Sequence, residues 1–231
     1  MKMKPDYTLY YWPVPFRGHF IRAILTYACA NWTEGGNVPA LMQTPDLEKI
    51  VPFMGPPVLI DHTADDFATS QMPAIALYLG EKFKLVGDMP QKKTRALKII
   101  LDANDLIDEL TLQGGMEMWT PEKWQEFMPR LKRWMSFWEI ELARAGGKNM
   151  LGTSNLTIAD IVTATLFGTL TERFDSLRQI LETTAPNTSN LIQSIWTHEL
   201  ADFAEKSRQT YGDTYCGGQI EQSLRKVLRQ K

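Results

Sequence analysis

The stretch that decides the fold is YTLYYWPVPFRG, which runs from Tyr7 to Gly18. Its pattern predicts a short apolar strand, a turn with two prolines, and a helix that opens at an arginine-glycine pair. This order places a phenol hydroxyl beside a helix N-terminus, where helix N–H groups and a hydroxyl donor both favour the charged form of a bound thiol. Tyr10 and Tyr11 face opposite ways along a strand, so the facing decides which of them lies there.

The residues around this stretch predict a small α/β domain over 1–84, because short strand patterns alternate with helix patterns. The nearly all-apolar run 9–12 is typical of a strand that helices cover on both faces. Residues 85–91 form a predicted linker, and 92–231 show helical periodicity, which predicts an all-α second domain. The predicted strands are 8–12, 57–61 and a brief segment near Phe67, and the predicted helices of the first domain are 17–30 and 70–83.

The helical half carries clear start and stop signals. Thr120 precedes Pro121, which predicts a capped helix start, and the helix from there ends near Ala145, before a pair of glycines. In LTIADI, Thr157 and Asp160 have the spacing of a capping box. We interpret that motif as structural.

Composition excludes several classes of function. The 231 residues carry a net charge of −2 with no basic stripe, so we expect no nucleic-acid partner. The sequence shows no apolar run long enough for a membrane span or a signal peptide, and we therefore expect a cytoplasmic protein that does not bind membranes. The two cysteines lie far apart, and the three histidines are scattered, so we predict neither a disulfide framework nor a metal site.

Four motifs together resemble the cytosolic glutathione transferases, and the likeness spans almost the whole chain. They are YTLYYWPVPFRG, the GPPVLID of 55–61, the ATSQMPAIALYLGEKF of 68–83 and the LTIADIV of 156–162. The likeness is greatest to the tyrosine-type classes such as pi and sigma. It implies a thioredoxin-like N-terminal domain of order βαβαββα followed by a helical domain, and glutathione as a substrate, with no metal.

The resemblance implies that Tyr11 is the catalytic tyrosine, one residue before Trp12-Pro13, and that its hydroxyl donates to the glutathione sulfur. A free thiol with a pKa of about 8.5 is only a few per cent thiolate at neutral pH, so the reaction needs such help. Pro57 aligns with the family's cis-proline, whose preceding residue pairs with the cysteinyl part of glutathione. That residue is Pro56, which has no N–H and offers only its carbonyl.

Further glutathione contacts are implied at both ends of the peptide. Ser70 is expected to begin the helix and to join its N–H groups in binding the γ-glutamyl carboxylate, with Thr69 beside it where relatives carry Gln or Glu. Arg17 and Lys49 are candidates for the glycyl carboxylate, or else solvated surface charges. Glu109 is expected to meet the γ-glutamyl ammonium bound by a neighbouring subunit, which implies a homodimer.

The second substrate is expected to be a small apolar electrophile, held between the turn after Tyr11 and the helical domain. Met and aromatic side chains make adaptable apolar walls, although such residues also build ordinary cores. The candidates are Phe16, Met116, Trp119 and Tyr211, with Met116 just after a predicted break at 113–115.

We therefore predict a glutathione S-transferase that conjugates glutathione to hydrophobic electrophiles, a detoxification reaction. Peroxide reduction by the same thiolate is a possible side activity that the sequence does not separate from conjugation. A non-catalytic member of the same fold, serving as a glutathione-binding or protein-interaction module, is the alternative. A dimerising structural domain without any ligand is the third hypothesis.

Overall fold

The structure is a computed structural model that describes residues 4–229, and its elements follow the predicted order. The N-terminal part is βαβαββα, as predicted, with a short 3₁₀ turn at Asp46–Glu48 between α2 and β3. Its elements are β1 (Tyr7–Tyr10), α1 (Arg17–Tyr27), β2 (Trp32–Glu34), α2 (Val38–Gln43), β3 (Val58–Asp61), β4 (Phe67–Ser70) and α3 (Met72–Lys82).

The C-terminal part is entirely helical within the described residues. Its helices are α4 (Pro90–Leu110), α5 (Leu112–Gly115), α6 (Pro121–Arg144), α7 (Ile158–Arg173), α8 (Asp175–Thr184), α9 (Pro186–Thr197), α10 (Ala201–Tyr211) and α11 (Gly218–Arg229). α4 begins inside the predicted linker, because Pro90 occupies the first helical turn, where a proline needs no N–H partner. The predicted fold class, an α/β part followed by an all-α part, is confirmed.

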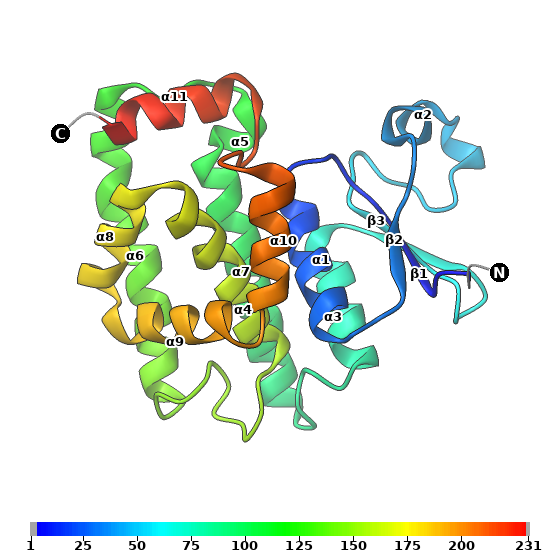
Figure 1. Cartoon of the computed structure of the whole chain (residues 1–231), viewed down its shortest axis with the longest axis horizontal. Helices are drawn as coiled ribbons and strands as arrows, with labels where there is room; N and C mark the ends of the chain where they lie inside the picture. Colours follow the sequence, from blue (N-terminus) through cyan, green and yellow to red (C-terminus); the bar gives the residue numbers. More distant parts are fainter. Residues whose placement is uncertain (1–3, 230–231) are drawn as a thin grey trace.

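The four strands form one sheet of order β2-β1-β3-β4. β1 is parallel to β2 and antiparallel to β3, and β3 is antiparallel to β4. α1 and α3 lie between the sheet and the helical part, whereas α2 lies away from it (Figure 1). β1 is shorter than predicted and stops at Tyr10, so Tyr11 and Trp12 already belong to the turn.

α7 is the central helix of the molecule. Its residues from Ile158 to Leu170 are all buried, which is the pattern of a helix that other elements surround. The capping box predicted at its start is present. Asp160 accepts from the N–H of Thr157 at 2.7 Å and from the N–H of Met150 at 2.7 Å, so it also fixes the loop before the helix. α1 packs between this helix and the sheet, which joins the two parts of the chain.

Candidate functional site

The register of the sheet brings three loops together at one end. Tyr10 pairs with Val58, and Val58 pairs with Ser70. Because β3 runs antiparallel to both neighbours, the residues just beyond this row are Tyr11, Pro57 and Gln71. Neighbouring strands are about 4.8 Å apart, so these residues lie side by side. The residues that the sequence predicts for thiol and peptide binding therefore meet at one end of the sheet.

Tyr11 places its hydroxyl at the N-terminus of α1. The hydroxyl oxygen accepts a hydrogen bond from the backbone N–H of Arg17 at 3.0 Å. Its ring lies on Gly18, where an added Cβ would approach the Tyr11 Cγ to 2.3 Å. The backbone N–H groups of Arg17 and Gly18 both act on this oxygen as donors, so the hydroxyl's own proton is free to be donated.

Burial raises the pKa of Tyr11 to about 12, although the charges of Arg17 and Arg22 and the N–H groups of α1 act in the opposite direction. The phenol therefore stays protonated across the physiological range. It suits the role of a hydrogen-bond donor and not that of a base. The neighbouring Tyr10 points elsewhere, because its ring packs on Gly35 after β2.

Arg22, which the sequence analysis did not identify, fixes the turn that carries Tyr11. Its guanidinium donates to the carbonyls of Val14 at 2.9 Å and Trp12 at 3.1 Å, and to the Glu34 carboxylate at 2.6 Å. The residue is only 4% exposed. An arginine one turn into a helix gives no motif in the sequence, and only the fold shows that the preceding turn wraps around it.

The peptide bond between Pro56 and Pro57 is cis, which confirms the conformation that the resemblance implies. The bond lies directly before β3, beside the end of β1. Pro56 has no N–H, so the carbonyl is the one backbone hydrogen-bonding group that it presents.

The predicted helix start at Ser70 is wrong. Ser70 ends β4 and Thr69 lies inside that strand opposite Leu59, while α3 begins at Met72. Gln71 stands between them with φ of 72°, an unusual conformation for a residue other than glycine. The pairing of β4 with β3 continues through Ser70, so Ser70 belongs to the sheet. The first residue of α3 is Met72, whose side chain is buried.

The start of α3 is a weaker anion site than the sequence analysis implied. A methionine stands at its first position, and Pro73 at the second contributes no N–H. Neither Gln71 nor another side chain caps this end. Ser70 lies two residues earlier, at the end of the sheet.

The two cations predicted for the glycyl carboxylate are both engaged. Arg17 pairs with Asp108 of α4 at 2.6 Å and lies over the Phe16 ring. Lys49 pairs with Asp46 at 2.7 Å. A carboxylate ligand would have to share or displace these acids.

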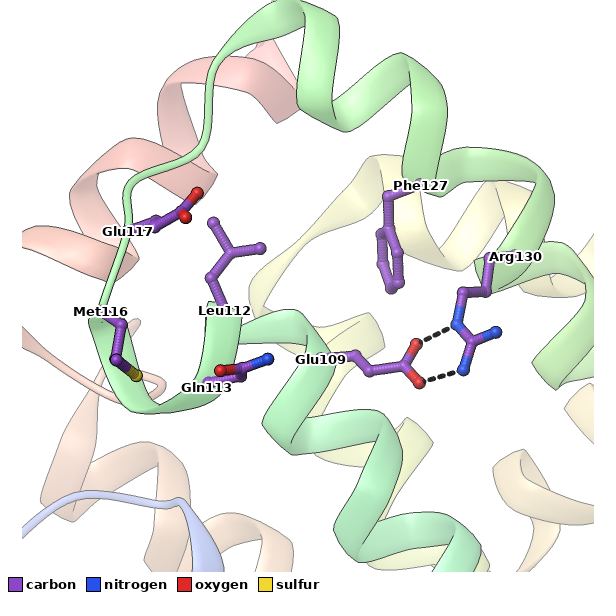
Figure 2. Close-up of a pocket in the computed structure, with 7 residues that line it drawn as sticks. All are labelled: Glu109, Leu112, Gln113, Met116, Glu117, Phe127 and Arg130. Atoms are coloured by element: carbon purple, nitrogen blue, oxygen red, sulfur yellow. Dashed lines mark hydrogen bonds and ion pairs between the residues drawn. The ribbon is translucent and has the colours of Figure 1, made fainter.

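Glu109, predicted to face a neighbouring subunit's ligand, makes a bidentate pair within its own chain. Its two oxygens accept from Arg130 at 2.5 and 2.7 Å (Figure 2). One of them also accepts from the indole of Trp134 at 3.1 Å. Burial opposes ionisation of Glu109, but these donors lower its pKa overall. The negative charge of Glu109 is therefore already balanced by Arg130 of α6.

The four residues predicted to hold the electrophile have different surroundings in the structure. Phe16 packs edge-on against Tyr215, with ring centroids 5.5 Å apart. Trp119 is buried and donates to the Leu110 carbonyl at 2.9 Å. Tyr211 packs on His19, with ring centroids 5.7 Å apart. These three aromatics therefore take part in packing, whereas Met116 is 79% exposed.

Met116 lines a cavity of about 450 Å³ between the end of α4 and α6 (Figure 2). The predicted break before it is present, because Leu112, Gln113 and the two following glycines all have positive φ. This volume is within the range of small-molecule sites. The lining residues are Glu109, Leu112, Gln113, Met116, Glu117, Phe127 and Arg130.

Among residues 4–229, no group of three or more His, Cys, Asp or Glu side chains is arranged to hold a metal ion. No helix in this part of the chain has the length and apolar character needed to cross a membrane.

Comparison with known proteins gives one family match. The family model described as "Glutathione S-transferase, C-terminal domain" matches residues 95–227. No curated protein matches the chain.

Solved structures share the fold across almost their whole length. The pi-class glutathione S-transferase of Onchocerca volvulus has 19% identity and a TM-score of 0.73, over 92% of this chain and 98% of that one. The glutathione S-transferase from Ascaris lumbricoides has 21% identity and a TM-score of 0.69, over 88% and 98%. Na-GST-3 from Necator americanus, described as monomeric, has 19% identity and a TM-score of 0.70, over 87% and 97%.

Proposed function

Because this chain belongs to the glutathione S-transferase family, we propose that it binds glutathione at the end of the sheet and conjugates the thiolate to small hydrophobic electrophiles. The observation that supports the proposal most directly is the Tyr11 hydroxyl, which accepts from the Arg17 N–H at 3.0 Å, so that its own proton would be available to a sulfur. We assign Tyr11 the catalytic role.

The chemistry follows from this donor. A hydrogen bond to the thiolate, beside the positive end of α1, stabilises the anion over the thiol. The thiol proton leaves to solvent, the sulfur attacks an electrophilic carbon, a C–S bond forms, and the leaving group departs with its bonding pair. A thiol pKa lowered by about two units corresponds to roughly 2.7 kcal/mol.

We propose that the remaining glutathione contacts surround Tyr11. The Pro56 carbonyl, next to the cis bond to Pro57, would accept from the cysteinyl N–H. Ser70 and Thr69 would face the γ-glutamyl group. Arg17 and Lys49 would face the glycyl carboxylate, each exchanging its present acid partner for the ligand.

Replacing Tyr11 with phenylalanine tests the catalytic assignment, with Tyr10→Phe as the matched control. With a chlorinated nitroaromatic at pH 6.5, the thiolate fraction should fall up to ~100-fold in Tyr11→Phe. The more basic thiolate is also more nucleophilic, which restores about ten-fold, so the net loss in kcat/KM is about ten-fold. Tyr10→Phe should retain its rate. Equal rates for wild type and Tyr11→Phe would reject the assignment.

The second substrate is proposed to bind in the cavity that Met116 lines. The cavity begins at Glu109, next to Asp108, which pairs with Arg17 at the start of α1. In the same assay, Met116→Ala should raise KM for the nitroaromatic several-fold and leave glutathione binding unchanged. An unchanged KM would remove the cavity from the proposal. The same preparation assayed with an organic hydroperoxide tests the peroxidase side activity.

A non-catalytic glutathione-binding module is the second candidate, because Pro56 lacks an N–H and Met72 with Pro73 begins α3. Calorimetric titration with glutathione separates the candidates. Heat of binding without conjugation of any electrophile in a broad panel favours the module. No heat at millimolar glutathione would exclude both proposals.

We also propose a homodimer, the assembly that the family resemblance implies. Light scattering after size exclusion should give twice the chain mass of 26.4 kDa. A single-chain mass would instead match the monomeric state described for Na-GST-3. A cytoplasmic location stays a prediction of the sequence.

A further inference from the structure

Three residues that each carry an unpaired buried polar atom line one small cavity behind the Tyr11 turn. Within residues 4–229, the buried side-chain nitrogens and oxygens without a hydrogen-bond partner are His19 Nδ1, Thr169 Oγ1 and Tyr215 OH. All three residues line the same cavity, and Pro15 and Phe16 of the turn form another part of its wall. The three come from α1, α7 and the segment between α10 and α11, so the coincidence is not a local effect of sequence.

Unpaired polar atoms destabilise a buried site, and native folds bridge them with protein groups or with water. The cavity measures about 10 Å³. That is about the smallest size that admits one water molecule, and a buried water typically makes about three hydrogen bonds. The number of unpaired atoms and the size of the space therefore agree.

The hydrogen bonds of His19 determine which of its ring nitrogens carries the proton. Ser207 Oγ accepts from Arg173 Nη2 at 2.9 Å and lies 3.1 Å from His19 Nε2. In the described part of the chain the Ser207 hydroxyl has no other acceptor for its proton, so we assign that proton to the bond with Nε2. Burial, with the charges of Arg22 and Arg173, lowers the pKa of His19, so the ring is neutral. Its single N–H is therefore at Nδ1, the unpaired atom.

We propose that this cavity holds one structural water, which accepts from His19 Nδ1–H and exchanges hydrogen bonds with the hydroxyls of Thr169 and Tyr215. Water is the ligand that fits, because one N–H donor and two hydroxyls require a partner that both donates and accepts. The water joins α1, α7 and the chain after α10 at one point. This inference does not depend on glutathione binding.

The position gives the water a structural role for the candidate site. Tyr215 is held from the other side by Glu221, whose carboxylate accepts from the N–H groups of Tyr215 at 3.0 Å, Cys216 at 3.0 Å and Gly217 at 2.6 Å. The Tyr215 ring supports Phe16, in the turn between Tyr11 and α1. The proposed water thus holds the segment around Tyr215 against the turn that contains Phe16.

Thr169→Val and Tyr215→Phe test the proposal, because the two states of the cavity predict opposite signs. Removing a hydroxyl that water bridges should lower the melting midpoint by about 2–4 °C in each variant. Removing an unpaired hydroxyl from a dry cavity should raise the midpoint or leave it unchanged. In the double variant the loss should be smaller than the sum, because both hydroxyls share one water.

Thr165→Val provides the matched control. Thr165 lines the same cavity, but its hydroxyl donates to the Ile161 carbonyl at 2.7 Å, so its effect should add to that of Tyr215→Phe. A high-resolution crystal structure should show one water within 2.6–3.2 Å of the three atoms. A dry cavity, a raised midpoint or additive losses for Thr169 and Tyr215 would each overturn the proposal.

Discussion

At the scale of single residues, the two adjacent tyrosines show how a neighbour decides chemistry. Tyr10 is the last residue of β1 and packs on Gly35, whereas Tyr11 lies past the strand and reaches the first N–H of α1. The same side chain packs on a strand end in one position and accepts a helix N–H in the other. The difference comes from strand alternation and from the turn that follows.

The raised pKa of Tyr11 predicts the pH dependence of conjugation. Because burial raises this pKa to about 12, the phenol remains a donor, and the rate should not fall between about pH 9 and 10, where an ordinary tyrosine ionises. The deficit of Tyr11→Phe should shrink as pH passes about 8.5, since the free thiol then ionises unaided. A pH–rate profile of both proteins checks this. A fall of the wild-type rate near pH 10 would contradict it.

Some site residues were predictable from the sequence and others were not. The cis bond at Pro57 was implied by the family resemblance, and the pairing of Thr157 with Asp160 followed from a local motif whose geometry depends on a few adjacent residues. The start of α3 did not, because serine is a common N-cap and the ladder that keeps Ser70 in the sheet is a contact with β3. The internal pairing of Glu109 with Arg130 also depends on how two helices pack.

At the scale of elements, the turn between β1 and α1 depends on the first helix that follows it. Arg22 lies in α1 and holds two carbonyls of the turn, at Trp12 and Val14, while its charge is balanced by Glu34 at the end of β2. One buried side chain thus sets the relative positions of two strands, a turn and a helix.

We predict that Arg22→Lys lowers the free energy of unfolding by about 2–3 kcal/mol, because an ammonium cannot reproduce the fork that reaches both carbonyls and the carboxylate. Conjugation should also slow as the turn shifts Tyr11. Chemical denaturation and the conjugation assay measure the two effects. Arg133→Lys, at an exposed position of α6, is the control and should change neither. A stable, fully active Arg22→Lys protein would show that the turn does not need this residue.

The order of elements was predictable because hydrophobic period and turn residues are local signals. The break before Met116 was visible in its two glycines. Whether the four candidate residues for the electrophile line a pocket was not predictable in the same way. Phe16, Trp119 and Tyr211 are aromatic residues that pack into separate interfaces, and composition does not distinguish a pocket wall from a core.

At the scale of the whole molecule, the two parts of the chain share one core. Arg17 forms an ion pair with Asp108, and His19 Nε2 lies 3.1 Å from Ser207 Oγ. The N–H of Ile158 donates to the Leu85 carbonyl at 2.8 Å. α1, which belongs to the N-terminal part, contacts both α3 and α7. Neither part buries its apolar faces without the other.

The shared core predicts a single unfolding transition. Trp12 and Trp32 report on the N-terminal part, and five further tryptophans report on the helical part. Tryptophan fluorescence and far-UV circular dichroism should therefore give the same midpoint, as expected for two-state unfolding. Two separated transitions, or different midpoints for the two signals, would show that the parts unfold independently.

The contact between Gly18 and Tyr11 has a consequence for how the chain tolerates change. The phenol ring rests directly on the backbone of α1 at Gly18. A methyl group there would clash with the ring, since a Cβ at position 18 would lie 2.3 Å from it. Such a methyl would leave every group that bonds to a substrate in the sequence, yet it would disconnect the hydroxyl from its N–H. One extra carbon atom at position 18 should therefore lower activity, although that position carries no reactive side chain.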